Sequence, residues 1–164
     1  MASKFMEKLG FGKDNKLIIL SPIEGDACPI NEVKDPTFGE KILGDGIAIH
    51  PKKGQVVAPA DGTVAILFET KHAVTIVSDQ GTEILIHIGL DTVNLKGEHF
   101  RAFVKSNDKV KAGDLLLEFD MEEIAKKGYD LISPIVICNT AKYSDIETYP
   151  GNVKELDKIM TLKK

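Results

Sequence analysis

KHAVTIVSDQGTEILIHIG, residues 71–89, contains two apolar runs that a polar turn joins. Runs of Val, Ile and Thr around a short turn with Asp and Gly are typical of an antiparallel β-hairpin. One histidine, His87, stands inside the second run at residues 84–88. Because burying a charged or unpaired imidazole costs free energy, this ring is either held by a polar partner or tuned for chemistry by its apolar neighbours.

Short apolar runs and turns also alternate outside this hairpin, in both directions along the chain. Turns with Gly, Pro or Asp separate runs rich in Val, Ile and Leu, a spacing that predicts an all-β fold, an antiparallel β-sandwich. The strands are expected at residues 17–20, 46–49, 55–58, 62–69, 73–77, 83–88, 115–119 and 133–138.

Two segments carry helix signals. Residues 120–128 begin with an acidic N-cap, Asp120, continue with Glu123 and end at Gly128, which predicts a short helix. Residues 152–160 are a weaker helix candidate. We therefore expect a sandwich with only a few short helices.

Composition limits the function classes. The chain has 164 residues, 43% of them hydrophobic, which suits a single domain that we place at residues 16–164. Its formal net charge of −4 argues against a basic nucleic-acid-binding face. No apolar run approaches the roughly 20 residues that cross a bilayer, and no signal-peptide pattern opens the chain, so we expect a cytoplasmic protein. Cys28 and Cys138 lack metal-ligand spacing and are expected as reduced thiols, with a disulfide as the alternative.

The first fifteen residues differ from the rest and are expected to form a separate arm, residues 1–15. Met1, Phe5 and Leu9 recur at helical spacing, with lysines on other faces. Two interpretations fit this pattern: a tail without fixed structure, and an amphipathic helix whose residues 1–12 contact anionic lipid or a partner.

Pairing across the hairpin brings a second histidine, His72, toward His87. A loop at residues 80–81 makes His72 the diagonal neighbour of His87, and a loop at residues 79–80 places the two directly opposite each other. Either two-residue loop puts both rings on one face, whereas a three-residue loop would break this parity. The shared face is expected to carry Phe68, Thr70, Val74, Leu85 and Gly89.

Two imidazoles on one apolar face suit three tasks: binding zinc, acting as a base with its orienting partner, or accepting a phosphoryl group with electrostatic help. Positions 85 and 89, where an H-x-H pair would place a third zinc ligand, are Leu85 and Gly89. A G-x-S-x-G nucleophile motif and a Gly-rich phosphate loop before a helix are also missing from the sequence. Phosphoryl transfer through a histidine fits best, since it needs little beyond a neutral ring nitrogen and a docking surface.

GTEILIHIGLDTV, residues 81–93, resembles over its full length the phosphorylation-site signature of the glucose-type IIA component. This family carries phosphoryl groups in the bacterial phosphoenolpyruvate-dependent sugar phosphotransferase system. Further blocks resemble the family in order at residues 44–49, 58–64, 68–73, 94–98 and 113–120, so that the resemblance covers roughly residues 17–140. It implies a duplicated barrel-sandwich type of β-sandwich and no required cofactor.

The resemblance also implies roles for individual residues. His87 would accept the phosphoryl group on Nε2 from the phosphorylated histidine-containing carrier protein (HPr) and pass it to a cysteine of the IIB domain of a sugar permease. His72 would stabilise the transferring group, Thr70 would lie in hydrogen-bond reach of the pair, and the carbonyl of Gly89 would orient His87. Asp35 and Asp91 would flank the site as acidic partner contacts. An apolar docking patch would comprise Phe38, Ile42, Leu43, Phe68, Leu85 and Val93.

Further partners and ligands follow only from the family. Regulated permeases or metabolic enzymes would be additional partners, and His72 and His87 could share a zinc ion with a partner's carboxylate. Pro36 and Thr37 replace small apolar residues beside the patch, which makes it more polar there. The two remaining histidines, His50 and His99, are expected to face solvent.

Two other classes share parts of the pattern. A lysostaphin-like zinc peptidase has similar strand turns but needs a third zinc ligand. A biotinyl- or lipoyl-type carrier resembles residues 58–64 and 110–119 but needs a lysine at a tight hairpin tip, whereas Lys71 directly precedes His72. The phosphocarrier interpretation is therefore preferred.

Overall fold

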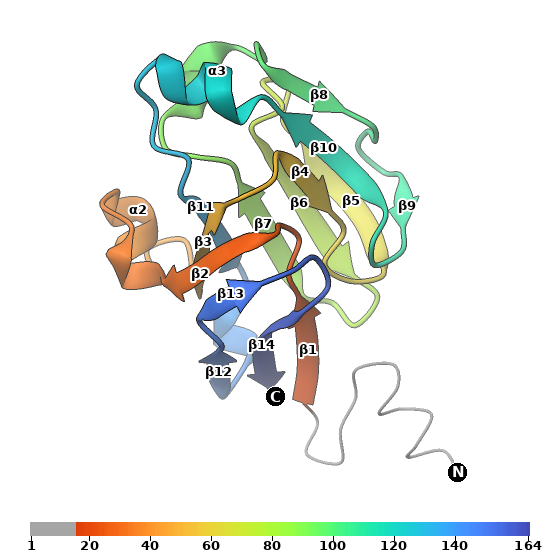
Figure 1. Cartoon of the computed structure of the whole chain (residues 1–164). Coiled ribbons are helices and arrows are strands. Elements are labelled where there is room, and N and C mark those ends of the chain that lie inside the picture. Colours follow the sequence, from red (N-terminus) through yellow and green to blue (C-terminus); the bar gives the residue numbers. More distant parts are fainter. Residues whose placement is uncertain (1–15) are drawn as a thin grey trace.

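The computed structural model describes residues 16–164, whose fourteen strands form three antiparallel sheets (Figure 1). The largest sheet has eight strands in the order β13-β2-β3-β11-β7-β6-β5-β9. Its strands are β2 (Gly25–Pro29), β3 (Asp45–Pro51), β5 (Gly62–Leu67), β6 (Ala73–Ser78), β7 (Glu83–His87), β9 (Lys109–Val110), β11 (Ser133–Ile137) and β13 (Gly151–Val153).

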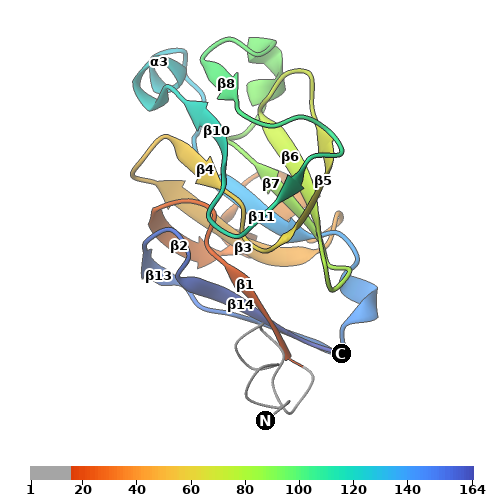
Figure 2. The same cartoon turned by 90° about the vertical axis from the view of Figure 1, so that its right-hand side faces the viewer.

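Two three-stranded sheets complete the sandwich and lie toward opposite ends of the molecule in both views (Figures 1 and 2). One has the order β1-β14-β12 and the other β4-β10-β8. Their strands are β1 (Lys16–Leu20), β14 (Lys158–Lys163), β12 (Asp145–Thr148), β4 (Gln55–Val57), β10 (Leu115–Phe119) and β8 (Phe100–Ala102). The antiparallel β-sandwich predicted from the sequence is confirmed.

Helices are short and few in the described residues. The two α-helices are α2 (Pro36–Gly39) and α3 (Met121–Lys126), and the 3-10 turns are η1 (Ile30–Glu32), η2 (Thr92–Leu95) and η3 (Thr140–Lys142). The helix predicted at residues 120–128 is confirmed as α3, because the Asp120 side chain caps it by accepting a hydrogen bond from the Glu123 amide at 3.1 Å. Gly128 follows its end with a φ of +88°.

Apolar side chains of all three sheets pack into one main core, which includes Ile86 of β7, Leu117 of β10 and Met160 of β14. A second, smaller cluster covers the opposite face of the large sheet. There the η1–α2 segment lays Ile30, Val33 and Phe38 over Ala48, Ala73, Leu85, Ile132 and Val136. The large sheet is thus apolar on both faces at its centre, which explains why residues 84–88 read as a nearly continuous apolar run.

The hairpin loop differs from the prediction. Val77 pairs with Glu83, and the Ser78 amide donates to the Thr82 carbonyl at 2.9 Å, so the loop has three residues, 79–81. Gly81 supplies the left-handed conformation that such a loop uses, with a φ of +91°. The prediction of a two-residue loop is therefore wrong, and so is the parity drawn from it. Val74 points into the main core, whereas Leu85 belongs to the second cluster.

The weaker helix predicted at residues 152–160 is also wrong. This segment forms β13, a turn, and the start of β14. The Asp157 carboxylate accepts a hydrogen bond from the Lys154 amide at 2.8 Å, and Leu156 has a φ of +71°, which a helix cannot accommodate. Residues 159–162 are all buried in β14, the central strand of its sheet, and Ile159, Met160 and Leu162 belong to the main core.

Candidate functional site

His87 and His72 meet on the outer face of the large sheet, beside the η1–α2 segment. His87 is the last residue of β7 and pairs with Ala73 of β6. The ring centroids of His72 and His87 lie 4.9 Å apart and the ring planes are 87° from parallel. The predicted juxtaposition of the two histidines is therefore present, although the pairing by which we expected it is not.

A turn before β6 delivers His72 to the site. Lys71 adopts a φ of +55°, so the regular alternation of side chains does not extend back through this residue. The His72 carbonyl still accepts a hydrogen bond from the Ile88 amide at 2.7 Å, which ties the turn to the chain just after His87. The Thr70 hydroxyl lies 2.6 Å from Nδ1 of His72 and fixes the orientation of that ring.

Gly89 fixes the orientation of the His87 ring. Nδ1 of His87 lies 2.8 Å from the carbonyl oxygen of Gly89. A carbonyl can only accept a hydrogen bond, so Nδ1 carries the proton and Nε2 of the neutral ring is left with a free lone pair. The Phe38 ring packs against His87 on one side, with ring centroids 4.8 Å apart.

Burial keeps both rings uncharged near neutral pH. Desolvation and, as a smaller effect, the nearby His87 together lower the pKa of His72 from 6.5 to about 4. Desolvation also lowers the pKa of His87, while the Gly89 carbonyl and the carboxylates of Asp35 and Asp91 act in the opposite direction. The site thus presents an unprotonated nitrogen nucleophile next to a second neutral imidazole.

Two members of the predicted docking patch contact the histidine pair, since the Phe38 ring packs against His87 and the centroid of the Phe68 ring lies 5.6 Å from that of His72. The exposed fraction is 69% for Ile42 and 45% for Val93, and Leu43 and Phe68 are also exposed. Phe38 and Leu85 are buried in the second apolar cluster. An exposed apolar group of this kind around a polar centre is typical of a surface that binds another protein.

Asp35 and Asp91 lie near enough to His87 to influence its pKa, as the sequence interpretation required. Asp35 caps α2, because its carboxylate accepts a hydrogen bond from the Thr37 amide at 3.0 Å. Asp91 is exposed and has a φ of +61° just before η2. Pro36 and Thr37, which make the neighbouring surface more polar, are both exposed.

Sequence reasoning missed Ile66, a further apolar residue on this face. Ile66 pairs with Thr75, which in turn pairs with Leu85, and its side chain is 52% exposed. The register of β5 shifts between Val64 and Ile66, and this irregularity turns Ile66 outward. A strict alternation from the buried Val64 would put Ile66 in the core, so no signal in the sequence identifies it.

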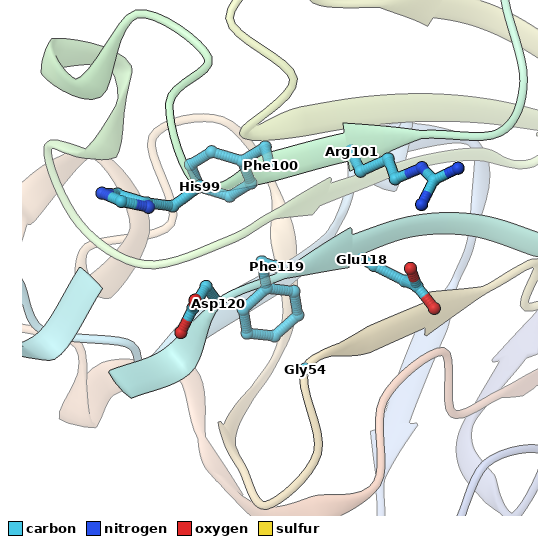
Figure 3. Close-up of a pocket in the computed structure, with 7 residues that line it drawn as sticks. All are labelled: Gly54, His99, Phe100, Arg101, Glu118, Phe119 and Asp120. Atoms are coloured by element: carbon cyan, nitrogen blue, oxygen red, sulfur yellow. The ribbon is translucent and has the colours of Figure 1, made fainter. Parts of the chain in front are cut away.

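A surface hollow of about 480 Å³ lies elsewhere, over β8 and β10 (Figure 3). It is lined by Gly54, His99, Phe100, Arg101, Glu118, Phe119 and Asp120. The prediction that His99 faces solvent is wrong, because its side chain is only 18% exposed and its Nε2 lies 3.6 Å from the Glu98 carboxylate. His50 is exposed as predicted.

Within residues 16–164, no group of three or more His, Cys, Asp and Glu side chains is placed to hold a metal ion. Zinc shared with a partner's carboxylate stays a prediction. Cys28 and Cys138 are free thiols. The described part of the chain contains no helix that is long and apolar enough to span a membrane. The proposed arm at residues 1–15 lies outside the described residues.

Comparison with known proteins connects this site to a family. The family model described as phosphoenolpyruvate-dependent sugar phosphotransferase system, EIIA 1, matches residues 17–143. The chain belongs to this family. It is an EIIA component of the phosphotransferase system, a protein that relays phosphoryl groups during sugar uptake.

Individual relatives agree with this assignment. The glucose-specific EIIA component of Oceanobacillus iheyensis is 43% identical over 88% of this chain and 87% of its own length. The β-glucoside-specific EIIBCA component of Bacillus subtilis is 50% identical over 87% of this chain, which spans 22% of that longer protein. The structure of glucose permease IIA from Mycoplasma capricolum superimposes with a TM-score of 0.84 at 40% identity, covering 89% of this chain and 95% of that one.

Proposed function

We propose that His87 is the phosphoacceptor of this EIIA component. In the first step the N–P bond of phosphorylated HPr breaks and a bond forms between phosphorus and Nε2 of His87. In the second step that bond breaks and the phosphoryl group passes to a cysteine thiolate of a IIB domain. The hydrogen bond from Nδ1 to the Gly89 carbonyl at 2.8 Å carries this proposal, because it leaves Nε2 unprotonated and free to attack.

His72 stabilises the phosphoryl group during both steps. Its ring is edge-on to His87, and the Thr70 hydroxyl can donate to its Nδ1, which places the proton on Nε2. Because the two ring centroids lie 4.9 Å apart, the Nε2–H of His72 can donate a hydrogen bond to an oxygen of the phosphoryl group as negative charge develops there. Since burial holds the pKa of His72 near 4, its ring acts as a neutral donor before phosphorylation. The negative charge of the phosphoryl group on His87 then favours protonation of His72.

The apolar rim and the two carboxylates form the docking surface for both partners. Ile42, Leu43, Phe68 and Val93 offer exposed apolar area, and Ile66 extends it along β5. Asp35 and Asp91 complement a basic rim on a partner, which speeds encounter without making the complex permanent. The B. subtilis relative carries its IIB and IIC parts in the same chain, which supports a permease as the receiving partner, with the relay located in the cytoplasm.

Phosphorylation assays test the acceptor directly. The protein is incubated with phosphoenolpyruvate, enzyme I and HPr, and we expect base-stable, acid-labile phosphate on the wild-type chain. His87→Gln should carry none and should unfold at the same temperature as the wild type, while the exposed His50→Gln control should be labelled normally. Phosphate on His87→Gln would move the acceptor to another residue.

A further inference from the structure

The peptide units Ile88–Gly89 and Gly89–Leu90 lie just after His87, and every N–H and C=O group in them has a hydrogen-bond partner. In the Ile88–Gly89 unit, the Ile88 carbonyl accepts a hydrogen bond from the Thr92 hydroxyl, and the Gly89 amide donates to the Ser133 hydroxyl at 3.3 Å. In the Gly89–Leu90 unit, the Gly89 carbonyl accepts from His87, and the Leu90 amide donates to the Asp130 carbonyl at 2.9 Å. Both units are thus fixed at both ends.

The hydroxyls of Thr92 and Ser133 hold the first of these units from opposite sides. Both residues are completely buried, with exposed fractions of 0%. Ser133 also donates to the Leu131 carbonyl at 2.8 Å, so its hydroxyl bridges the loop before β11 to Gly89. Buried hydroxyls with this many bonds fix the groups they contact, because losing one bond leaves a buried group unsatisfied.

Gly89 is the residue whose backbone these bonds restrain. Its φ of +73° is a conformation that glycine adopts readily, and glycine alone can also rotate away from it at little cost. A Cβ here would lie 2.8 Å from both the Asp130 carbonyl oxygen and the Thr92 methyl, so a bulkier residue cannot replace it. The carbonyl that orients His87 therefore belongs to a residue with a flexible backbone. Hydrogen bonds from neighbouring residues are needed to hold that backbone in one conformation.

We propose that Thr92 and Ser133 are positioning residues for phosphoryl transfer. They hold the Ile88–Gly89 peptide, which keeps the Gly89 carbonyl against Nδ1 of His87 and keeps the ring in the tautomer with a free Nε2. Neither residue touches the phosphoryl group. This inference rests on the proposed function of His87, but its structural part, the restraint of the tautomer, does not require phosphorylation.

The test compares hydroxyl deletions with conservative replacements. Thr92→Val and Ser133→Ala remove the hydroxyls, Thr92→Ser and Ser133→Thr restore them, and Ser78→Ala is the matched control. Ser78 is also buried and its hydroxyl also accepts from a backbone amide, that of Thr82, but it lies at the hairpin turn. Two quantities are measured: the His87 tautomer from ring ¹⁵N chemical shifts at pH 7.5, and the rate of phosphorylation by HPr.

We expect both deletions to lower the fraction of His87 with a proton on Nδ1 and to slow phosphorylation by about 10-fold. The conservative replacements should recover both quantities, and Ser78→Ala should change neither even if it lowers the unfolding temperature. Should Thr92→Val unfold, Ser133→Ala, which removes a single heavy atom, decides the question. Deletions that leave tautomer and rate unchanged would overturn the proposal, whereas a wild-type chain that is not labelled at His87 would overturn the proposed function alone.

Discussion

The ring of His72 lies edge-on to the ring of His87, with centroids 4.9 Å apart, and each ring is fixed through its Nδ1 by a different neighbour. Gly89 fixes His87 through a backbone carbonyl, and Thr70 fixes His72 through a hydroxyl. A carbonyl enforces one tautomer, whereas a hydroxyl can donate or accept. The two rings are therefore suited to different roles, a constant nucleophile and an adaptable hydrogen-bond partner.

This difference predicts distinct phenotypes for the two histidines. His72→Gln should still accept phosphate on His87 but should pass it to IIB about 100-fold more slowly, because one donor to the transferring group is lost. Single-turnover transfer from the phosphorylated chain to an isolated IIB domain measures this rate. Transfer at the wild-type rate would show that His72 is dispensable.

The carboxylates near His87 predict a shift in its titration. Asp35→Asn should lower the pKa of His87 below its wild-type value, because it removes a negative charge that stabilises the imidazolium. Asparagine is as good an N-cap as aspartate, so α2 should remain intact. NMR titration of the His87 ring measures the pKa, with Asp26→Asn on the exposed surface as the control. A raised or unchanged pKa would contradict the proposed electrostatics.

Buried neutral His72 predicts acid sensitivity of the fold. The pKa is about 4 in the folded chain and near 6.5 when unfolded, so the unfolded chain binds the proton first as the pH falls. The free energy of unfolding is therefore unaffected by His72 above about pH 6.5. It falls by about 2–3 kcal/mol between about pH 6.5 and 4. Urea unfolding across this range should show a smaller loss for His72→Gln than for the wild type. If the free energy of unfolding falls equally with pH in the two chains, this explanation is refuted.

Local patterns in the sequence predicted most of the strands because alternation, glycine turns and the Asp120 cap act over a few residues. The meeting of the histidines was predicted for a wrong reason: the loop at residues 79–81 has three residues, and the turn at Lys71 restores the contact. The irregularity in β5 that exposes Ile66 depends on pairing with β6, which the sequence of β5 alone does not encode. Such features depend on how neighbouring strands pair, which the residue pattern of one strand does not specify.

The outward position of Ile66 predicts a docking phenotype. Ile66→Lys places a charge on an apolar surface that faces partners with basic rims, so the KM for phosphorylated HPr should rise about 10-fold with little change in kcat. Ile18→Lys on β1 is the control, because Ile18 is also an exposed isoleucine on a strand but belongs to another sheet. Equal effects of the two substitutions would remove Ile66 from the docking surface.

We propose that the phosphoryl group is carried on one particular nitrogen, Nε2 of His87. The most direct measurement is ¹H–¹⁵N NMR of the ¹⁵N-labelled chain after phosphorylation by phosphoenolpyruvate, enzyme I and HPr. We predict one phosphohistidine, with phosphorus coupled to Nε2 of His87 and the proton retained on Nδ1. Phosphorus on Nδ1 of His87, or on either nitrogen of His72, would contradict the account.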